Sequence, residues 1–428
     1  MMKLKMPQGS LKLTKDMRIL FILCWVTYVF TYLGRLDYSA CLVEIVNTEG
    51  WTKGMAGLIA TGFFTTYGIG QVINGYIGDK ISPKIMVALG LSLSGLINFL
   101  FPLSHNIYIA IILWCINGFV QSMIWSPLIR LLSSWLPEER RLKSCVNMNG
   151  TVPVGTLLVY GMSALLVYLG NWRLTFYVSG ILLIVMATIW FYGISNIENH
   201  LESGSSKTLL DVQDICPNKK IMSLPKLIVA AAMPLTFIAL FMQGMLKDGV
   251  TAWIPTFLEE NFNLTSAAAI LSTTLVPIIN LGGVYLAEFI NRRLFKNEIF
   301  TAMVFFAVGF VALILLTFGN VNSALLSLIL LATTTTFMMG INTLLASMMP
   351  AYYVKFGVTS TVTGLLNASA YLGAAFSSYE NGVIVENFGW NSIMYIWCIC
   401  AFAGIIVCLL ASKKWKHFRK MANELQLD

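Results

Sequence analysis

The stretch Tyr28-Val-Phe-Thr-Tyr32-Leu-Gly-Arg35-Leu-Asp37-Tyr38-Ser39-Ala40 decides how this chain folds, because it carries an arginine inside an apolar segment that begins at Ile19. A charged side chain at bilayer depth is costly, so it normally faces the interior of a helix bundle or a wet cavity. We therefore expect Arg35 to face a hydrated chamber built by the rest of the chain. The second half of the chain carries Lys247 at the matching place.

The composition indicates a membrane protein. Of 428 residues, 57% are hydrophobic and 11% are charged, and the mean hydropathy is +0.75. No water-soluble domain of this size has such values. Twelve apolar runs of about 20 residues can each cross the bilayer as a helix. Their centres lie near Phe30, Phe64, Gly95, Phe119, Leu157, Met186, Leu240, Ile278, Ala307, Leu331, Leu372 and Ala401.

The runs divide into two sets of six, separated by one long polar stretch. We expect an N-terminal bundle over 1–195, a linker over 196–226, and a C-terminal bundle with a tail over 227–428. Similar halves joined by a loop indicate parallel repeats, related by an axis along the membrane normal. The predicted fold class is therefore an all-α polytopic membrane protein with two pseudo-symmetric six-helix bundles.

The distribution of cations predicts the topology. Most of the 28 lysines and arginines fall in the N-terminal arm, the even-numbered loops, the linker and the tail. The positive-inside rule then places both termini and the linker in the cytoplasm, so the net charge of +8 reports topology and predicts no nucleic-acid partner. We expect a monomer in the inner membrane of a bacterium. The cysteines and histidines have no metal-type spacing, so neither a metal nor a cofactor is predicted.

A loop motif follows the second run and reads Gly75-Tyr-Ile-Gly78-Asp79-Lys80-Ile-Ser-Pro83-Lys84. Its small glycines permit close helix approach, and Asp79 with the nearby lysines predicts a charge relay between neighbouring cytoplasmic helix ends. The motif resembles the loop signature of the major facilitator superfamily, which implies that it gates the transport cycle. The corresponding second-half segment includes Tyr285, Glu288, Arg292 and Arg293.

Further segments resemble the organophosphate:inorganic phosphate antiporter family, which includes glycerol-3-phosphate, hexose-phosphate and glucose-6-phosphate transporters. They are Tyr32-Leu-Gly-Arg35, the fourth run with its exit from Asn117 to Arg140, Lys247 with Trp253-Ile-Pro255-Thr-Phe-Leu258, and the eleventh run from Ser360 to Gly373. The resemblance implies that Arg35 and Lys247 bind the phosphoryl group of a phosphate ester that is exchanged for inorganic phosphate. It also implies that Trp125, Asn149 and Tyr371 line the cavity.

Helical spacing adds four candidate binding residues. Tyr28 and Tyr32 precede Arg35 by seven and three residues and share its face, while Tyr67 and Gln71 form a polar stripe on the second span. The alternative is that each cation pairs with a carboxylate of its own helix, Arg35 with Asp37 and Lys247 with Asp248. Neighbours at i+1 and i+2 do not face each other on an α-helix, so the sequence argues against local pairing.

Several positions depart from the antiporter family. Gln71 stands where a lysine is common, Val152 where a histidine is common, and Gly244 and Gly340 where tyrosines are expected; Asp37 replaces an uncharged polar residue. The predicted cavity is therefore less cationic and less phenolic than that of a typical member. A monoanionic or carboxylate substrate becomes credible, and glycerol-3-phosphate becomes a poor candidate.

The predicted mechanism is exchange by alternating access, because two desolvated cations resist closure of an empty cavity. One rival is a proton-coupled symporter of an organic anion that titrates Asp37, Asp248 or Glu380. A second rival is a sugar-phosphate sensor without transport. The sequence has no nucleophile-base set, metal cluster or phosphate-cradling glycine loop, so we do not expect an enzyme.

Overall fold

The chain is helical throughout the part that a computed structural model describes, which is residues 10–51, 53–168, 171–203, 231–264, 276–319 and 321–427. Each of the twelve predicted span centres falls inside a helix. Lipid offers no partner for backbone amides and carbonyls, so apolar runs of this length satisfy those groups within the helix itself. The predicted all-α polytopic class is confirmed.

Contacts group the described residues into two compact units. The first holds residues 10–66, 74–203 and 354–361, and the second holds 67–73, 231–353 and 362–427. The middle of one N-terminal helix thus groups with the second unit, and a short segment after residue 353 groups with the first. The division at 1–195, 196–226 and 227–428 stays a prediction, because most of the predicted linker lies outside the described residues.

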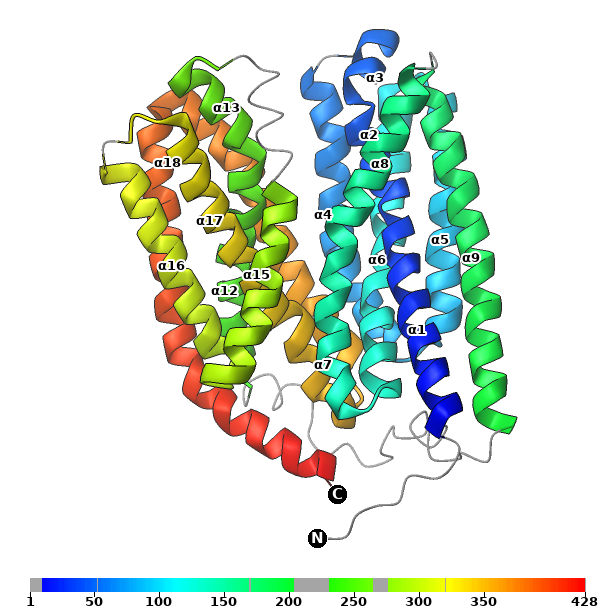
Figure 1. The fold of residues 1–428 in the computed structure, drawn as a ribbon. Coiled ribbons are helices and arrows are strands. Elements are labelled where there is room, and N and C mark those ends of the chain that lie inside the picture. Colours follow the sequence, from blue (N-terminus) through cyan, green and yellow to red (C-terminus); the bar gives the residue numbers. More distant parts are fainter. Residues whose placement is uncertain are drawn as a thin grey trace. The chain divides into compact units, whose positions relative to one another are not determined.

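The helices of the N-terminal half are coloured blue to green in Figure 1, where α5 runs beside α9. Their bounds are α1 (Ser10–Thr31), α2 (Leu33–Ala40), α3 (Leu42–Glu49), α4 (Lys53–Gly78), α5 (Pro83–Leu100), η1 (Phe101–Leu103), α6 (Ile107–Trp135), α7 (Glu138–Asn147), η2 (Met148–Gly150), α8 (Thr151–Tyr168) and α9 (Trp172–Ser203).

The C-terminal half contains, in order, α12 (Met233–Gly244), η3 (Met245–Gly249), α13 (Val250–Phe262), α15 (Val276–Ile290), η4 (Asn291–Phe295), α16 (Glu298–Phe318), α17 (Ala324–Asn342), η5 (Thr343–Met348), η6 (Met349–Phe356) and α18 (Thr359–Leu427). The last helix covers two predicted spans and is interrupted at Gly389, where φ is 77° and ψ is 174°. A residue with a side chain would be strained there, so the glycine marks the turn between the spans.

Eight described segments are long and apolar enough to cross a membrane, and many of their large apolar side chains are exposed. Leu165, Tyr192, Ile399 and Leu410 are each at least 60% exposed on such helices. An exposed apolar surface of this extent fits contact with lipid rather than with water. A set of polar side chains is buried instead, and several of them form the sites described next.

Candidate substrate-binding site

Arg35 lies just beyond a break in the first membrane-spanning segment. The i→i−4 hydrogen-bond pattern is interrupted at Tyr32, between α1 and α2, where the Arg35 amide donates to the Tyr32 carbonyl instead of the Thr31 carbonyl. Arg35 occupies the first turn of α2 with 7% of its surface exposed. A break of this kind at membrane depth requires polar partners for the carbonyls that it releases.

Buried side chains on α6 and α5 supply those partners. The Gln121 amide donates to the Thr31 carbonyl at 3.2 Å, and the Asn117 amide donates to the Gly34 carbonyl at 2.7 Å. Ser94 joins the two amides, because its hydroxyl donates to Asn117 Oδ1 at 2.7 Å and accepts from Gln121 Nε2 at 2.8 Å. This network fixes the start of α2, and with it the position of Arg35.

Three predicted binding residues form a series of ring contacts that begins beside Arg35. The guanidinium carbon lies 5.4 Å from the centre of the Tyr32 ring, Tyr32 meets Tyr28 edge to face at 5.8 Å, and Tyr28 contacts Trp125 at 4.6 Å. Gly155 on α8 makes room for this cluster, since a Cβ there would lie 2.6 Å from the Tyr32 ring.

The cluster offers donors for an anion. The Trp125 indole nitrogen is buried and has no hydrogen-bond acceptor among the described residues. A guanidinium, an indole N–H and phenol hydroxyls are all suited to an oxyanion. The first unit thus brings Tyr28 and Tyr32 together with Arg35, as the helical spacing predicts, and adds Trp125, which the resemblance implies as a cavity residue.

Lys247 lies in the second unit, within a π-helical turn. Residues Met245–Gly249 form this wide turn between α12 and α13, and such turns are frequent at functional sites. The turn packs closely on α18, where the Ser377 hydroxyl donates to the Met245 carbonyl at 3.1 Å. Within this π-helical turn the Lys247 side chain is partly exposed, with 22% of its surface accessible.

The expectation that Lys247 is not paired locally is wrong. Lys247 Nζ lies 3.1 Å from Asp248 Oδ1, and 43% of the Asp248 side chain is exposed. The argument assumed α-helical geometry, which the π-turn replaces, and the long lysine side chain reaches its neighbour. The same expectation holds for Arg35, because Asp37 Oδ1 accepts the Tyr38 amide and Asp37 Oδ2 has no hydrogen-bond partner in the described chain.

Tyr67 and Tyr371 meet in the second unit. Their rings lie 4.8 Å apart in an edge-to-face arrangement, and Gln71, one turn after Tyr67, is fully buried. Asn149 lies in η2, where its amide donates to the Val146 carbonyl at 3.1 Å. The role of these four residues in substrate binding stays a prediction.

The two glycines that replace expected tyrosines lie where helices touch. A Cβ on Gly244 would lie 2.0 Å from the Ala370 carbonyl oxygen, and one on Gly340 would lie 2.4 Å from the Phe305 ring. Neither position has space for a side chain. The absence of tyrosine therefore reflects close helix packing as well as a less phenolic cavity.

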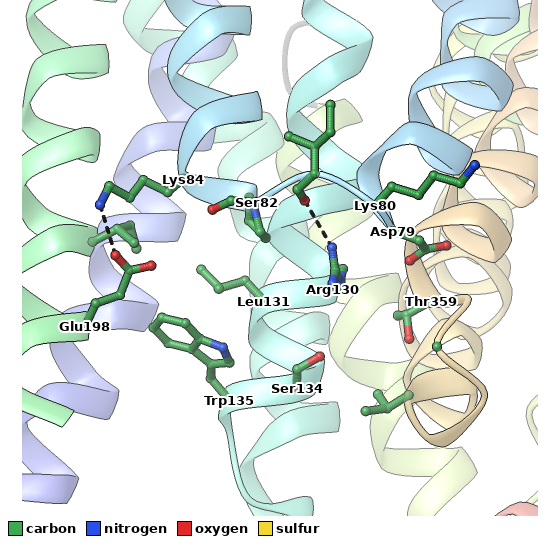
Figure 2. A pocket seen from close by; sticks show the side chains of 15 residues that line it. Asp79, Lys80, Ser82, Lys84, Arg130, Leu131, Ser134, Trp135, Glu198 and Thr359 are labelled. Atoms are coloured by element: carbon green, nitrogen blue, oxygen red, sulfur yellow. Dashed lines mark hydrogen bonds and ion pairs between the residues drawn. The ribbon is translucent and has the colours of Figure 1, made fainter. Parts of the chain in front are cut away.

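The loop motif after α4 borders a cavity of about 410 Å³ in the first unit. Figure 2 shows Lys84 and Glu198 on one side of this cavity, Asp79 and Thr359 on the other, and Arg130 between them. Lys84 Nζ lies 3.0 Å from Glu198 Oε2, and Arg130 Nη1 donates to the Gly78 carbonyl at 2.5 Å and the Ile81 carbonyl at 3.2 Å.

Asp79 does not form the predicted carboxylate–cation relay. Its oxygens accept hydrogen bonds from the amides of Ser360 and Thr361, at 2.8 and 2.7 Å, and from the Thr361 hydroxyl at 2.5 Å. The carboxylate therefore caps the start of α18, where an anion complements the helix dipole. Gly78 allows this approach, since a Cβ there would lie 2.4 Å from Ser360 Oγ.

Burial has the largest effect on the pKa of the Asp79 carboxyl. Burial raises the pKa of the Asp79 carboxyl above its ordinary value, while the hydrogen bonds from Thr361 and Ser360 and the charge of Arg130 oppose that rise. Lys80, the next residue, donates to the Tyr76 hydroxyl at 2.6 Å and lies over the Tyr76 ring. The motif's cations, Lys80 and Lys84, thus have partners other than Asp79. The remaining member of the motif, Gly75, is buried near the end of α4.

Sequence reasoning missed a carboxylate in the second unit. Glu298 at the start of α16 is 1% exposed and accepts from Trp415 Nε1 at 2.7 Å, Tyr352 Oη at 3.0 Å and Asn291 Nδ2 at 3.1 Å. Arg419 completes the set at 3.3 Å. In the sequence, Glu298 follows several cations at the end of a predicted span, where an exposed carboxylate is expected. Only a pairing with Arg419, far away in the chain, could have indicated that Glu298 is buried.

Comparison with known proteins agrees with the helical architecture. The sequence profile described as Major Facilitator Superfamily matches residues 24–378. The chain belongs to the Major Facilitator Superfamily. Among solved structures, the superfamily's proton:xylose symporter XylE bound to 6-bromo-6-deoxy-D-glucose is similar, with a TM-score of 0.70 and 14% identity over 92% of this chain and 95% of that one. At that identity the likeness shows the superfamily fold alone.

Curated members of the superfamily are more informative about ligands. The chain is 23% identical to a probable hexose phosphate transport protein of Chlamydia trachomatis, over 92% of this chain and 90% of the relative. It is 25% identical to the glycerol-3-phosphate transporter of Bacillus subtilis, over 93% of both chains. It is 22% identical to the membrane sensor protein UhpC of Escherichia coli, over 92% and 91%. These names support the resemblance to the organophosphate antiporter family.

Proposed function

We propose that this chain transports a phosphorylated small metabolite and exchanges it for inorganic phosphate by alternating access. The observation that carries the proposal is the buried Arg35, which follows a helix break and lies beside the Tyr32 ring of the cluster that Tyr32 forms with Tyr28 and Trp125. Relatives named as hexose phosphate and glycerol-3-phosphate transporters support the substrate class. Membership of a transporter superfamily excludes an enzymatic role.

Arg35 is proposed to hold the phosphoryl group. Its planar guanidinium can donate two parallel hydrogen bonds to an oxyanion, and charge-assisted bonds of this kind are stronger than neutral ones. The neighbouring Trp125 N–H and the tyrosine hydroxyls are proposed to bind the remaining phosphoryl oxygens or the organic part. Tyr67, Gln71, Asn149 and Tyr371 are proposed as further lining residues.

Lys247 is proposed as the second phosphoryl ligand, with Asp248 as its partner in the empty state. An exposed ion pair is worth no more than about 1 kcal/mol, so an incoming phosphate group can replace Asp248 at small cost. Closure with a phosphate group bound would bury the cations together with an anion, and burying opposite charges together costs far less than burying charges of one sign. This difference favours exchange over leak.

The loop motif is proposed as the cytoplasmic gate. The motif consists of Gly75, Gly78, Asp79, Lys80 and Lys84. Its Asp79 connects the end of α4 to the start of α18, and release of the Asp79 cap would free that helix end to move. We further propose a monomer in the inner membrane of a bacterium. Both termini and the linker are then cytoplasmic, as the distribution of cations indicates.

The test is counterflow in proteoliposomes loaded with inorganic phosphate. A thermal-shift screen against phosphate, hexose phosphates, triose phosphates and small carboxylates first identifies the substrate, since a ligand that binds the native state raises its melting temperature. We expect Arg35→Ala and Lys247→Ala each to abolish phosphate-dependent uptake. Lys414→Ala, which removes an exposed cation near the end of α18, is the control and retains uptake. Exchange at wild-type rates in both site variants contradicts the proposal.

A sensor without transport is the competing function, because one relative carries the name membrane sensor protein. The same proteoliposomes separate the two. Ligand-induced stabilisation together with flux supports the transporter, and stabilisation in the complete absence of flux supports the sensor.

A further inference from the structure

The chain after Ser412 forms a two-sided helix on the second unit. It is the last part of α18, and Figure 1 shows these turns in red, turned aside from the membrane-spanning part of the same helix. One face is packed against protein, because Trp415, Phe418 and Ala422 are each at most 1% exposed. The opposite face carries a row of exposed lysines at helical spacing, namely Lys413, Lys416 and Lys420.

Contacts with Glu298 and with an aromatic ring hold the packed face in place. The Trp415 indole donates to Glu298 Oε2 at 2.7 Å, and the Arg419 guanidinium donates to both Glu298 oxygens at 3.3 Å. The Tyr353 ring stacks on the Phe418 ring at 5.1 Å between centres. The protein therefore fixes the orientation of this helix, and the row of lysines is presented outward.

A second basic segment meets the same carboxylate. The Asn291 amide, at the start of η4, donates to Glu298 Oε1 at 3.1 Å. Arg293 in η4 and Lys296 just after it are both exposed. Because η4 and the end of α18 both contact Glu298, their exposed cations contribute to one surface of the second unit. We call this surface the basic face, and it consists of Arg293, Lys296, Lys413, Lys416 and Lys420.

The carboxylates near the basic face do not neutralise it. The sequence has no aspartate or glutamate from Asn387 to Asn423. Near η4, Glu288 is paired with Arg292 at 3.1 Å, and Glu298 is only 1% exposed and is occupied by its own donors. A surface with several exposed cations and few exposed carboxylates attracts a partner that carries several negative charges.

Exposed apolar side chains border the basic face. On α18, Ile406, Leu409 and Leu410 are 43%, 53% and 61% exposed, and Lys413 follows Leu410 by three residues, or about 4.5 Å along the helix. In η4, Leu294 is 65% exposed. An apolar surface that ends at a row of cations matches the boundary between lipid tails and phosphate headgroups, where lysine stems lie along apolar groups and the ammonium reaches the headgroup.

We propose that the basic face binds the headgroups of anionic phospholipids in the adjacent leaflet. The lysine and arginine side chains contact the phosphate oxygens, while the upper parts of the acyl chains lie against Leu294 and Leu410. Free phosphate and nucleic acid offer the same negative charge, but neither has an apolar part for these exposed leucines. Lipid binding at this surface does not depend on the proposed transport function.

The test measures the melting temperature of the detergent-purified full chain during titration with phosphatidylglycerol and, separately, with phosphatidylcholine. A lipid that binds the folded state raises its melting temperature. We expect phosphatidylglycerol to raise it by several degrees more than phosphatidylcholine, and high salt to reduce this difference. The triple variant Lys413→Gln/Lys416→Gln/Lys420→Gln should lose most of the difference. The variant Lys413→Arg/Lys416→Arg/Lys420→Arg should keep it, because the charge is retained.

Two further variants are matched controls. Lys3→Gln/Lys5→Gln/Lys12→Gln removes the same charge from the N-terminal arm, and Lys414→Gln removes a cation that lies to one side of the row. Both should keep the preference for phosphatidylglycerol. An equal loss in the arm variant would show that net charge sets the preference, which overturns the proposal. An unchanged preference in the triple glutamine variant of α18 also overturns it.

The competing partners are tested on the same proteins. A rise in melting temperature with inorganic phosphate or a short oligonucleotide that exceeds the rise with phosphatidylglycerol, and that disappears in the triple glutamine variant of α18, would assign the basic face to that anion instead.

Photoactivatable phosphatidylglycerol locates the bound lipid directly. With the reactive group in the upper acyl chain, we expect crosslinks in the peptides that contain Leu294 or Leu410 and fewer of them in the triple glutamine variant. Crosslinks confined to other spans contradict the proposal.

Discussion

Lys247 Nζ lies 3.1 Å from Asp248 Oδ1, so the lysine that a phosphate ester is proposed to meet already holds an anion of its own chain. Both side chains are partly exposed, and the pair sits in a π-helical turn that packs on α18. Asp248 therefore competes with substrate for Lys247. The strength of that competition should be measurable.

Asp248→Asn removes the competing charge and keeps the shape of the side chain. Because an exposed ion pair contributes at most about 1 kcal/mol, we expect the apparent affinity for phosphate to rise by up to about fivefold. Thermal-shift titration with inorganic phosphate measures the change. Glu260→Gln, an exposed carboxylate on α13, is the control and leaves the affinity unchanged. A weaker affinity in Asp248→Asn would mean that Asp248 helps to bind the substrate instead.

Neither Gly244 nor Gly340 has space for the tyrosine that is expected at its position in the antiporter family. Gly244→Ala already places a methyl group 2.0 Å from the Ala370 carbonyl, and Gly340→Ala places one 2.4 Å from Phe305. Overpacking of this kind costs about 1–3 kcal/mol, so both variants should melt at a lower temperature than the wild type. Gly282→Ala is the matched control in a helix, because nothing lies within 4 Å of its Cβ position. Equal melting temperatures in all three variants would contradict this account.

The sequence predicted features that depend on periodicity and on the length of apolar runs. Apolar run length predicts the helical spans, and helical spacing brings Tyr28 and Tyr32 to the face of Arg35. Those two rules depend only on local geometry and on the cost of burying polar groups. They hold as long as the helix is regular.

Irregular backbone accounts for most of what the sequence could not give. The π-turn at Lys247 is set by packing on Ser377, and the break at Tyr32 is held by Asn117 and Gln121 from α6. These are tertiary contacts between residues far apart in the chain. The resemblance identified the loop motif. It did not predict that the Asp79 carboxylate accepts hydrogen bonds from backbone amides of α18 instead of pairing with the nearby lysines.

Glu298 is predicted to stabilise the second unit. Glu298→Ala leaves Arg419 without its carboxylate and removes the acceptor for Trp415, Tyr352 and Asn291. Breaking a buried ion pair in this way costs about 3 kcal/mol, which should lower the melting temperature clearly. Glu288→Ala is the control, because its partner Arg292 is 59% exposed and such pairs contribute at most about 1 kcal/mol. A larger loss in Glu288→Ala than in Glu298→Ala would contradict the assignment.

Asp79 should make the melting temperature depend on pH. Burial raises the pKa of its carboxyl, so the folded state favours the protonated form more than the unfolded state does. The stability that this preference contributes is fully present below the ordinary carboxyl pKa of about 3.9, and it is lost as the pH rises through the folded-state value. Asp79→Asn cannot ionise, so its melting temperature should gain on the wild type across that window.

The Asp79→Ala variant separates ionisation from capping. It removes the titrating group and every acceptor for Ser360 and Thr361, whereas Asp79→Asn keeps one side-chain oxygen that can still accept from one of these two residues. Asp79→Ala should therefore lose about 0.5–2 kcal/mol of stability relative to Asp79→Asn at every pH. Differential scanning fluorimetry of the three proteins between acidic and neutral pH gives both comparisons. Parallel curves for wild type and Asp79→Asn would show that burial does not control this carboxyl. Equal curves for the Asn and Ala variants would show that the cap does not hold α18.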